Sequence, residues 1–145
     1  MPTQQGTPRF SLATDRGRYE IWVPAKGLVL QRVGGHGNAD LVRAMIVQLD
    51  QAMSEGSPLS VFGDFEELEG YDADARSLLT KWTKDNFANL RVMHILVKSR
   101  AVATGVSVAN VALRGAMRSH TERARFEAAF ALELAQVTAT SPRKG

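Results

Sequence analysis

The chain has 145 residues, of which 44% are hydrophobic and 23% are charged, so it is long enough for one globular domain with a substantial core. It contains no cysteine, which excludes disulfides, thiolate metal sites and cysteine nucleophiles. The net charge of +3 is too small to predict nucleic-acid binding. A phosphate-binding face could be formed by Arg114, Arg118, Arg123 and Arg125, but a solvated helix surface explains these residues better.

The two ends of the chain differ in composition from the middle. Residues 1–17 are rich in proline, glycine and small polar side chains and are predicted to form a flexible N-terminal arm. Residues 137–145 are predicted to form a flexible C-terminal tail, and residues 18–136 a single domain. There is no signal-peptide pattern and no run of about eighteen apolar residues, so we expect a cytoplasmic protein without a membrane span.

The domain begins with a predicted β-hairpin. Residues 19–23 and 28–33 are rich in strand-forming side chains, and the segment between them begins with Pro24 and ends with Gly27. Proline suits the first position of a turn and glycine accepts a positive φ, so this spacing favours a tight turn.

Helices and strands alternate after the hairpin. Asn38 is placed to cap a helix whose apolar side chains recur at steps of three and four residues, and Ser119 with Glu122 fits a capping box for the last helix. The predicted helices cover residues 38–55, 72–88, 101–113 and the segment after residue 119, and the later strands cover residues 59–62, 92–97 and 117–120. This order predicts an α/β fold, a mixed β-sheet of four to five strands packed with about four helices.

The stretch from residue 59 to residue 82 concentrates the polar side chains. Its strand ends near Asp64, and an acidic loop then leads into a helix at Asp72. A buried strand that ends in an aspartate, followed by a helix N-terminus, is a common place for a functional site in α/β proteins. The candidate site residues of this stretch are found among Asp64, Glu66, Glu67, Glu69, Tyr71, Asp72, Asp74 and Ser77.

No familiar catalytic constellation is present. The three histidines, His36, His94 and His120, do not have the spacing of metal ligands. The acids around Asp64 could bind Mg²⁺, but the acidic pair that phospho-receiver domains carry after their first strand is replaced by Pro24-Ala25. No nucleophile, base and oxyanion site can be assembled, so we expect no catalytic residue, no metal and no cofactor.

Two patterns resemble a known family. Asp64 at a strand end, with Asp72 entering a helix eight residues later, resembles the STAS domains of bacterial anti-anti-sigma factors. The run VKSRAVATGVSVANVALRGAMRSHTERARFEAAF resembles the SpoIIAA-like proteins more closely, in which a strand, an Ala/Val helix, a short strand and a closing Phe-Glu-Ala-Ala helix follow in this order. The resemblance covers residues 19–134 and implies a STAS-like fold and a role in holding a partner.

The chain departs from that family at the start of the helix. Anti-anti-sigma factors carry Asp-Ser-Ser-Gly there, with a serine as the phosphorylation switch, whereas this chain has Asp72-Ala73-Asp74-Ala75. Ala73 cannot accept phosphate, and the single charge of Asp74 is smaller than the charge of about −1.5 to −2 on phosphoserine. Ser77 lies one helical turn beyond Ala73, but nothing local singles it out for modification. We therefore expect no serine switch.

These observations predict a non-catalytic protein-interaction module of bacterial regulation, with another protein or a second copy of the chain as partner. The expected partner-binding residues are Asp64, Glu66, Glu67, Tyr71, Asp72, Asp74 and Ser77. Two alternatives remain open. One is a small apolar or lipid-like ligand between the sheet and the helices, lined by Trp22, Trp82 and the small residues of helix 101–113. The other is a Mg²⁺-dependent enzyme built on Asp64.

Overall fold

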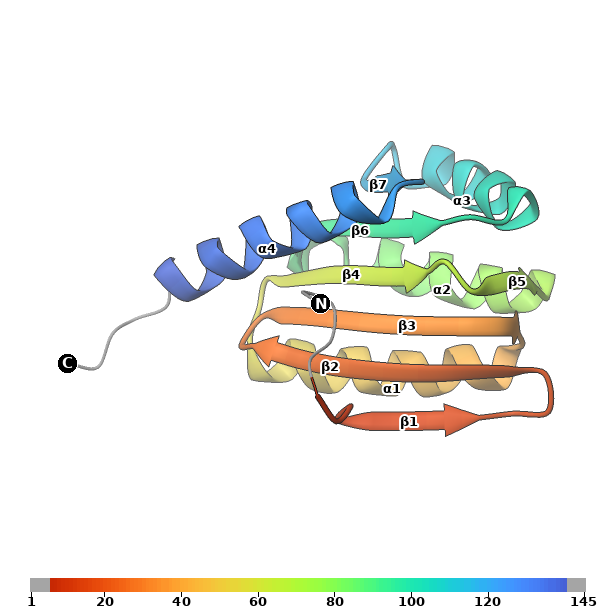
Figure 1. Cartoon of the computed structure of the whole chain (residues 1–145), viewed down its shortest axis with the longest axis horizontal. Coiled ribbons are helices and arrows are strands. Elements are labelled where there is room, and N and C mark those ends of the chain that lie inside the picture. Colours follow the sequence, from red (N-terminus) through yellow and green to blue (C-terminus); the bar gives the residue numbers. More distant parts are fainter. Residues whose placement is uncertain (1–5, 141–145) are drawn as a thin grey trace.

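A computed structural model describes residues 6–140, which form one mixed β-sheet with helices on both faces (Figure 1). The strands are β1 Phe10–Ala13, β2 Gly17–Ala25, β3 Leu28–Gly37, β4 Leu59–Phe65, β5 Leu68–Tyr71, β6 Leu90–Val97 and β7 Met117–His120. The helices are α1 Ala39–Glu55, α2 Ala73–Asp85, α3 Arg100–Ala112 and α4 Arg123–Thr140, with a 3₁₀ turn η1 at Phe87–Asn89. The expected α/β class and four helices are confirmed, whereas the sheet of the described residues has seven strands rather than four or five.

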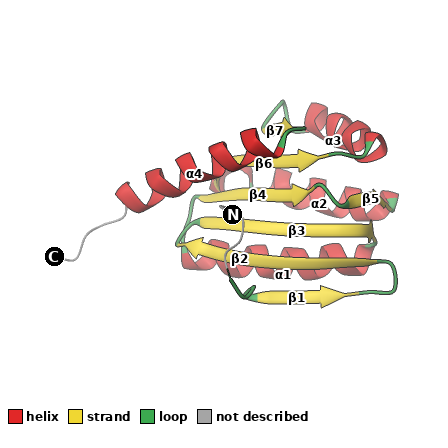
Figure 2. Ribbon diagram, in the orientation of Figure 1, coloured by secondary structure: helices red, strands yellow, loops and turns green. Residues whose placement is uncertain are grey.

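The strands are arranged in the order β1-β2-β3-β4-β6-β7, and β5 also pairs with β3 (Figure 2). β1, β2 and β3 are antiparallel neighbours, whereas β3, β4, β6 and β7 run parallel to one another. Parallel neighbours need crossover connections, and α1, α2 and α3 provide them. The carboxyl ends of β3, β5 and β6 therefore lie at one edge of the sheet, where these helices begin.

The predicted hairpin forms β2 and β3. Lys26 and Gly27 make its turn, with Ala25 opposite Leu28, and Gly27 has the expected positive φ of 83°. The segment predicted as an arm contributes a further strand, because Phe10–Ala13 pairs with β2 as the edge strand β1. At the other end, α4 continues to Thr140 through part of the predicted tail. The predictions for residues 1–5 and 141–145 lie outside the described residues.

Side chains cap the starts of α1 and α3. Asn38 Oδ1 accepts a hydrogen bond of 2.9 Å from the Leu41 amide, and Ser99 Oγ accepts one of 3.4 Å from the Val102 amide. The predicted capping box of the last helix is wrong. Ser119 belongs to β7 instead, because strand pairing with Ile95 holds it, and the first helical turn of α4 closes on the Glu122 carbonyl.

Each face of the sheet has its own core. The larger core lies under α1, α2 and α3 and includes Met45, Val61 and Val102. The smaller one lies under α4 and includes Phe62, Phe126 and Phe130, whose rings meet edge to face at centroid distances of 5.7 and 5.3 Å from Phe62. Along β4 successive side chains alternate between the two cores, because neighbouring residues of a strand point to opposite faces.

A buried polar contact holds the middle of α4 against the sheet. Glu133 is 6% exposed, and its Oε2 accepts hydrogen bonds from Ser60 Oγ at 2.6 Å and from Arg91 Nε at 2.7 Å. The carboxylate is thus paired and hydrogen-bonded, which burial requires. Among residues 6–140 no helix is both long and apolar enough to cross a bilayer.

Candidate functional site

The predicted acidic loop between Asp64 and the next helix is mostly strand. β4 extends to Phe65, so Asp64 lies inside it, and only Glu66 and Glu67 separate β4 from β5. Both strands pair in parallel with β3, first along residues 28–32 and then along residues 35–37. Strand pairing with β3 therefore replaces the loop that composition alone had suggested.

Asp72 occupies the N-cap position of α2, but its side chain does not cap the helix. Its Oδ1 lies 2.7 Å from Nε2 of His36 on β3, and its amide donates to the Gly37 carbonyl at 2.9 Å. These contacts fix the start of α2 against the end of β3. They also connect two polar residues that the sequence analysis had treated separately.

The exposed part of the candidate site is the first turn of α2. Asp72, Ala73, Asp74 and Ser77 are exposed, and Ala75 is buried against the larger core. Asp74 makes no ion pair in the described part of the chain. The helix start therefore presents carboxylates next to its own positive dipole end, a favourable position for them.

Tyr71 points inward from the end of β5. A Cβ added to Gly105 of α3 would lie 1.1 Å from the Tyr71 hydroxyl oxygen, so the ring occupies the space that a larger residue would fill. Tyr71 packs on the larger core and is only partly exposed. Its role in the structure is to join β5 to α3.

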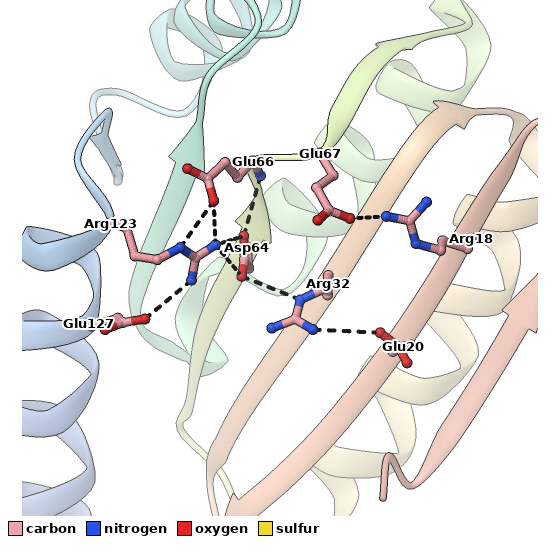
Figure 3. Close-up of polar contacts among 8 residues, drawn as sticks. All are labelled: Arg18, Glu20, Arg32, Asp64, Glu66, Glu67, Arg123 and Glu127. Carbon is pink, nitrogen blue, oxygen red and sulfur yellow. Dashed lines mark hydrogen bonds and ion pairs between the residues drawn. The ribbon is translucent and has the colours of Figure 1, made fainter. Parts of the chain in front are cut away.

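Asp64 faces α4 and is the centre of an ion-pair network (Figure 3). Its side chain is 3% exposed, and its two oxygens accept from Arg123 Nη2 at 3.0 and 2.9 Å. Arg32 Nε on β3 lies 3.4 Å from Oδ2, and Arg32 also approaches Glu20 at 4.0 Å. A buried carboxylate is thereby neutralised by two guanidinium groups from different elements.

Glu66 and Glu67 belong to the same face. Glu66 Oε1 accepts from Arg123 Nη2 at 2.7 Å, and Glu67 pairs with Arg18 on β2 (Figure 3). Arg123 also lies 3.3 Å from Glu127 of α4. Of the predicted site residues, Asp64, Glu66 and Glu67 thus lie together beside α4, whereas Asp72, Asp74 and Ser77 lie at the start of α2.

Arg123 was expected on a solvated helix surface, and the structure places it instead against Asp64 and Glu66. Burial alone would lower its pKa, but hydrogen bonds to Glu66 and Asp64 outweigh this and raise the pKa above its usual value. The guanidinium is therefore permanently charged. Because it forms hydrogen bonds with both Asp64 and Glu66, it occupies oxygens that a Mg²⁺ ion would need. Residues 6–140 hold no cluster of three possible metal ligands.

His94 and His120 form a second polar group on the α4 face. His94 Nδ1 lies 2.8 Å from His120 Nε2, and the His94 ring stacks on Phe62 at a centroid distance of 4.6 Å. Burial, followed by the charges of His120 and Arg118, lowers the pKa of His94 to about 4. At neutral pH the pair is therefore neutral and serves as a hydrogen-bonded part of the smaller core.

A cavity of about 110 Å³ lies in the larger core, between the sheet and the helices α1, α2 and α3. Its lining is almost wholly apolar and includes Met45, Leu79, Met93 and Val106. Trp82, Gly105 and Ala109 also line it, as the ligand alternative expected, but Trp22 lies on the opposite face of the sheet.

Solved structures with the same fold identify the architecture. The phosphorylated form of the Bacillus cell fate determinant SpoIIAA matches 77% of this chain and 98% of its own, with a TM-score of 0.55 and 13% identity. The anti-sigma factor antagonist SpoIIAA in its unphosphorylated form matches 86% of this chain and 99% of its own, with a TM-score of 0.57 and 14% identity.

A third structure is an uncharacterised DUF3478-family protein with a SpoIIAA-like fold from Shewanella loihica. It matches 79% of this chain and 94% of its own, with a TM-score of 0.60 and 14% identity. No family model matches the chain, and no curated protein matches it. At these identities the likenesses show the fold alone, and they confirm the STAS-like fold that the sequence resemblance implied.

Replacement of Arg123 by methionine is expected to lower the free energy of unfolding by about 3 kcal/mol, because Asp64 stays buried with only Arg32 as partner. Urea denaturation measures this change. The matched control is Arg125→Met, which removes an exposed arginine two residues away and should change stability by less than about 0.5 kcal/mol. Equal effects of the two substitutions would contradict the assigned role of the Asp64–Arg123 pair.

Lowering the pH should reduce the free energy of unfolding through protonation of His94. The unfolded chain binds a proton to this ring below about pH 6.5, whereas the folded chain resists until about pH 4, so stability falls as the pH drops through this window. Because the ring is partly exposed to solvent, we expect a loss of only about 1–2 kcal/mol. His94→Phe should flatten the dependence of the unfolding free energy on pH between 6.5 and 4. An unchanged slope would show that His94 is not the group responsible.

Proposed function

We propose that this chain is a non-catalytic protein-interaction module of bacterial regulation, with the first turn of α2 as the centre of its partner-binding surface. The observation that carries the proposal is the exposed sequence Asp72-Ala73-Asp74, held at the sheet edge by the contact of Asp72 with His36. The SpoIIAA structures of the same fold are of an anti-sigma factor antagonist in unphosphorylated and phosphorylated forms.

The first support is the rigidity of this surface. The Asp72 amide is bonded to β3, Ala75 is buried, and Tyr71 is packed on Gly105, so the turn is anchored on three sides. A surface that is already ordered loses little conformational entropy when a partner binds. The exposed carboxylates of Asp72 and Asp74 then favour a partner with basic groups opposite them.

The second support concerns the switch. In the anti-anti-sigma factors that the sequence resembles, a serine at this helix start accepts phosphate, and alanine stands at that position here. Asp74 carries a charge that no kinase or phosphatase can change. The proposed module therefore binds constitutively, and its regulation has to come from the abundance of the partner or from another surface.

The third support is that the acidic residues on the α4 face are engaged in internal ion pairs. Asp64 and Glu66, on which a Mg²⁺-dependent enzyme would depend, are bonded to Arg123, so they stabilise the packing of α4. This arrangement favours a structural role for the α4 face and a binding role for the start of α2.

A charge reversal at the exposed turn tests the proposal. The Glu69→Lys/Asp74→Lys double variant reverses Asp74 in this turn and the exposed Glu69 on the adjoining strand β5. It should lose a partner that the wild-type chain captures by crosslinking from the native organism, while its melting temperature stays within a few degrees. Tyr71 is left intact because its replacement would open the core. Glu122→Lys, an exposed reversal beside α4, is the control and should retain the partner. A partner captured equally by all three proteins would place the interface elsewhere.

The cavity favours a second candidate function, the binding of a small apolar ligand between the sheet and α1–α3. A nearly apolar cavity of about 110 Å³ excludes ordered water and has room for a small hydrocarbon group. Native mass spectrometry of freshly purified protein should then show a bound species, and Ala109→Leu should displace it while it raises thermal stability. A wild-type protein that is ligand-free under gentle conditions would count against this function.

A further inference from the structure

The outer surface of α2 and α3 forms a groove on the side of the sheet away from α4. The groove has a volume of about 520 Å³ and lies between residues 76–85 of α2 and residues 108–112 of α3. α2 contributes Arg76, Lys81 and Lys84 to it, and α3 contributes Val108, Ala109 and Ala112. The two walls thus differ in chemistry, with cations on one side and apolar groups on the other.

The α3 wall is apolar and exposed. The helix carries no charged residue after Arg100, and its buried side is formed by Val102 and Gly105. Val108 on the opposite side is 54% exposed and Val111 is 82% exposed. Val108 lines the groove together with Ala109 and Ala112, and Val111 extends the exposed apolar surface of α3 beyond that lining.

The α2 wall carries a positive charge. Lys81 Nζ lies 2.6 Å from Asp85 Oδ2, so this pair is internally neutralised. Arg76 and Lys84 make no ion pair among residues 6–140, and both border the groove. Across the groove, α3 presents Val108, Ala109 and Ala112, so an occupant needs apolar groups on one side and carboxylates on the other.

We propose that this groove binds an acidic amphipathic helix of a partner protein. Two helices side by side form a channel that accepts a third helix, with apolar side chains at i, i+3, i+4 and i+7 against α3. α2 has 13 residues and is about 20 Å long, which matches an occupant of three to four turns. Glutamates along one flank of that helix would face Arg76 and Lys84.

The groove adjoins the first turn of α2 and shares Ser77 with that region, but its proposed contacts are made by Arg76, Lys84 and Val108, so the proposal stands apart from the partner surface proposed above. That surface is acidic and requires a basic partner, whereas the groove is basic and requires an acidic one. A single domain could thus hold two partners of opposite charge on neighbouring parts of α2.

Synthetic peptides test the groove with the full-length chain. We would titrate three helical peptides of about 16 residues and follow the backbone amide signals of the protein by NMR. The first has a leucine stripe with glutamate flanks, the second has the same stripe with lysine flanks, and the third has glutamate flanks but serines in place of the stripe. The first peptide should shift amides of residues 76–85 and 105–112 and bind at least tenfold more tightly than the other two.

Variants identify the two walls separately. Val108→Asp should weaken binding of the first peptide at least tenfold through loss of the apolar contact. Arg76→Glu/Lys84→Glu should reverse the preference, so that the lysine-flanked peptide binds more tightly. The Glu69→Lys/Asp74→Lys variant, designed for the other surface, should bind the first peptide within threefold of the wild type. The experiments can therefore contradict the groove proposal without affecting the test of the partner surface at the start of α2, and the reverse also holds.

Four results would overturn the inference. They are no binding of the first peptide, equal binding of all three, amide shifts confined to other surfaces, or an unchanged preference in the charge-reversed variant. Concentration-dependent shifts of the same amides together with dimer formation in sedimentation would assign the groove to a second copy of the chain. If the amide signals of these residues disappear on addition of phosphatidylglycerol vesicles but do not respond to any peptide, the groove would be assigned to a membrane surface.

Discussion

The pairing of Asp64 with Arg123 is the constraint around which the α4 face is organised. Asp64 is buried near the end of β4, between the parallel strands β3 and β6, where an unpaired carboxylate would cost several kcal/mol. Arg123, the first residue of α4, supplies the compensating charge. Near the middle of the helix, Glu133 makes a second buried polar contact, with Ser60 and Arg91. Between the two contacts, Phe126 and Phe130 pack on Phe62. The position of α4 is therefore specified by charge at two points and by apolar burial between them.

The two faces of the sheet have different roles as a result. The α4 face uses its charged and histidine side chains for its own packing, which leaves few polar groups for chemistry. The opposite face is covered by α1, α2 and α3, which enclose an apolar cavity and expose both the acidic start of α2 and the groove beside it. Binding is therefore expected on the side covered by α1, α2 and α3, where Asp74, Arg76 and Lys84 make no ion pair among residues 6–140.

Local signals were sufficient for much of the fold. The turn at Gly27, the cap at Asn38 and the spacing of apolar residues in α1 predicted their elements, because each depends on residues within one or two turns of each other. β1 and β5 were missed because short strands with mixed composition form only when a neighbouring strand offers hydrogen bonds. The capping box at Ser119 failed for a related reason, since pairing with β6 retained this residue in a strand.

The sequence by itself determined the α/β class, the order of most elements, the STAS-like resemblance and the absence of a serine at the start of α2. Only the tertiary structure decided what the candidate site residues do. Arg123 lies 59 residues from Asp64, and no local pattern predicts that they meet. Likewise the contact of the partly exposed Tyr71 ring with Gly105 of α3 joins residues 34 positions apart. The physical reason is the same in both cases: backbone periodicity depends on neighbouring residues, whereas the partner of a charge or a ring depends on which elements the folded chain brings together.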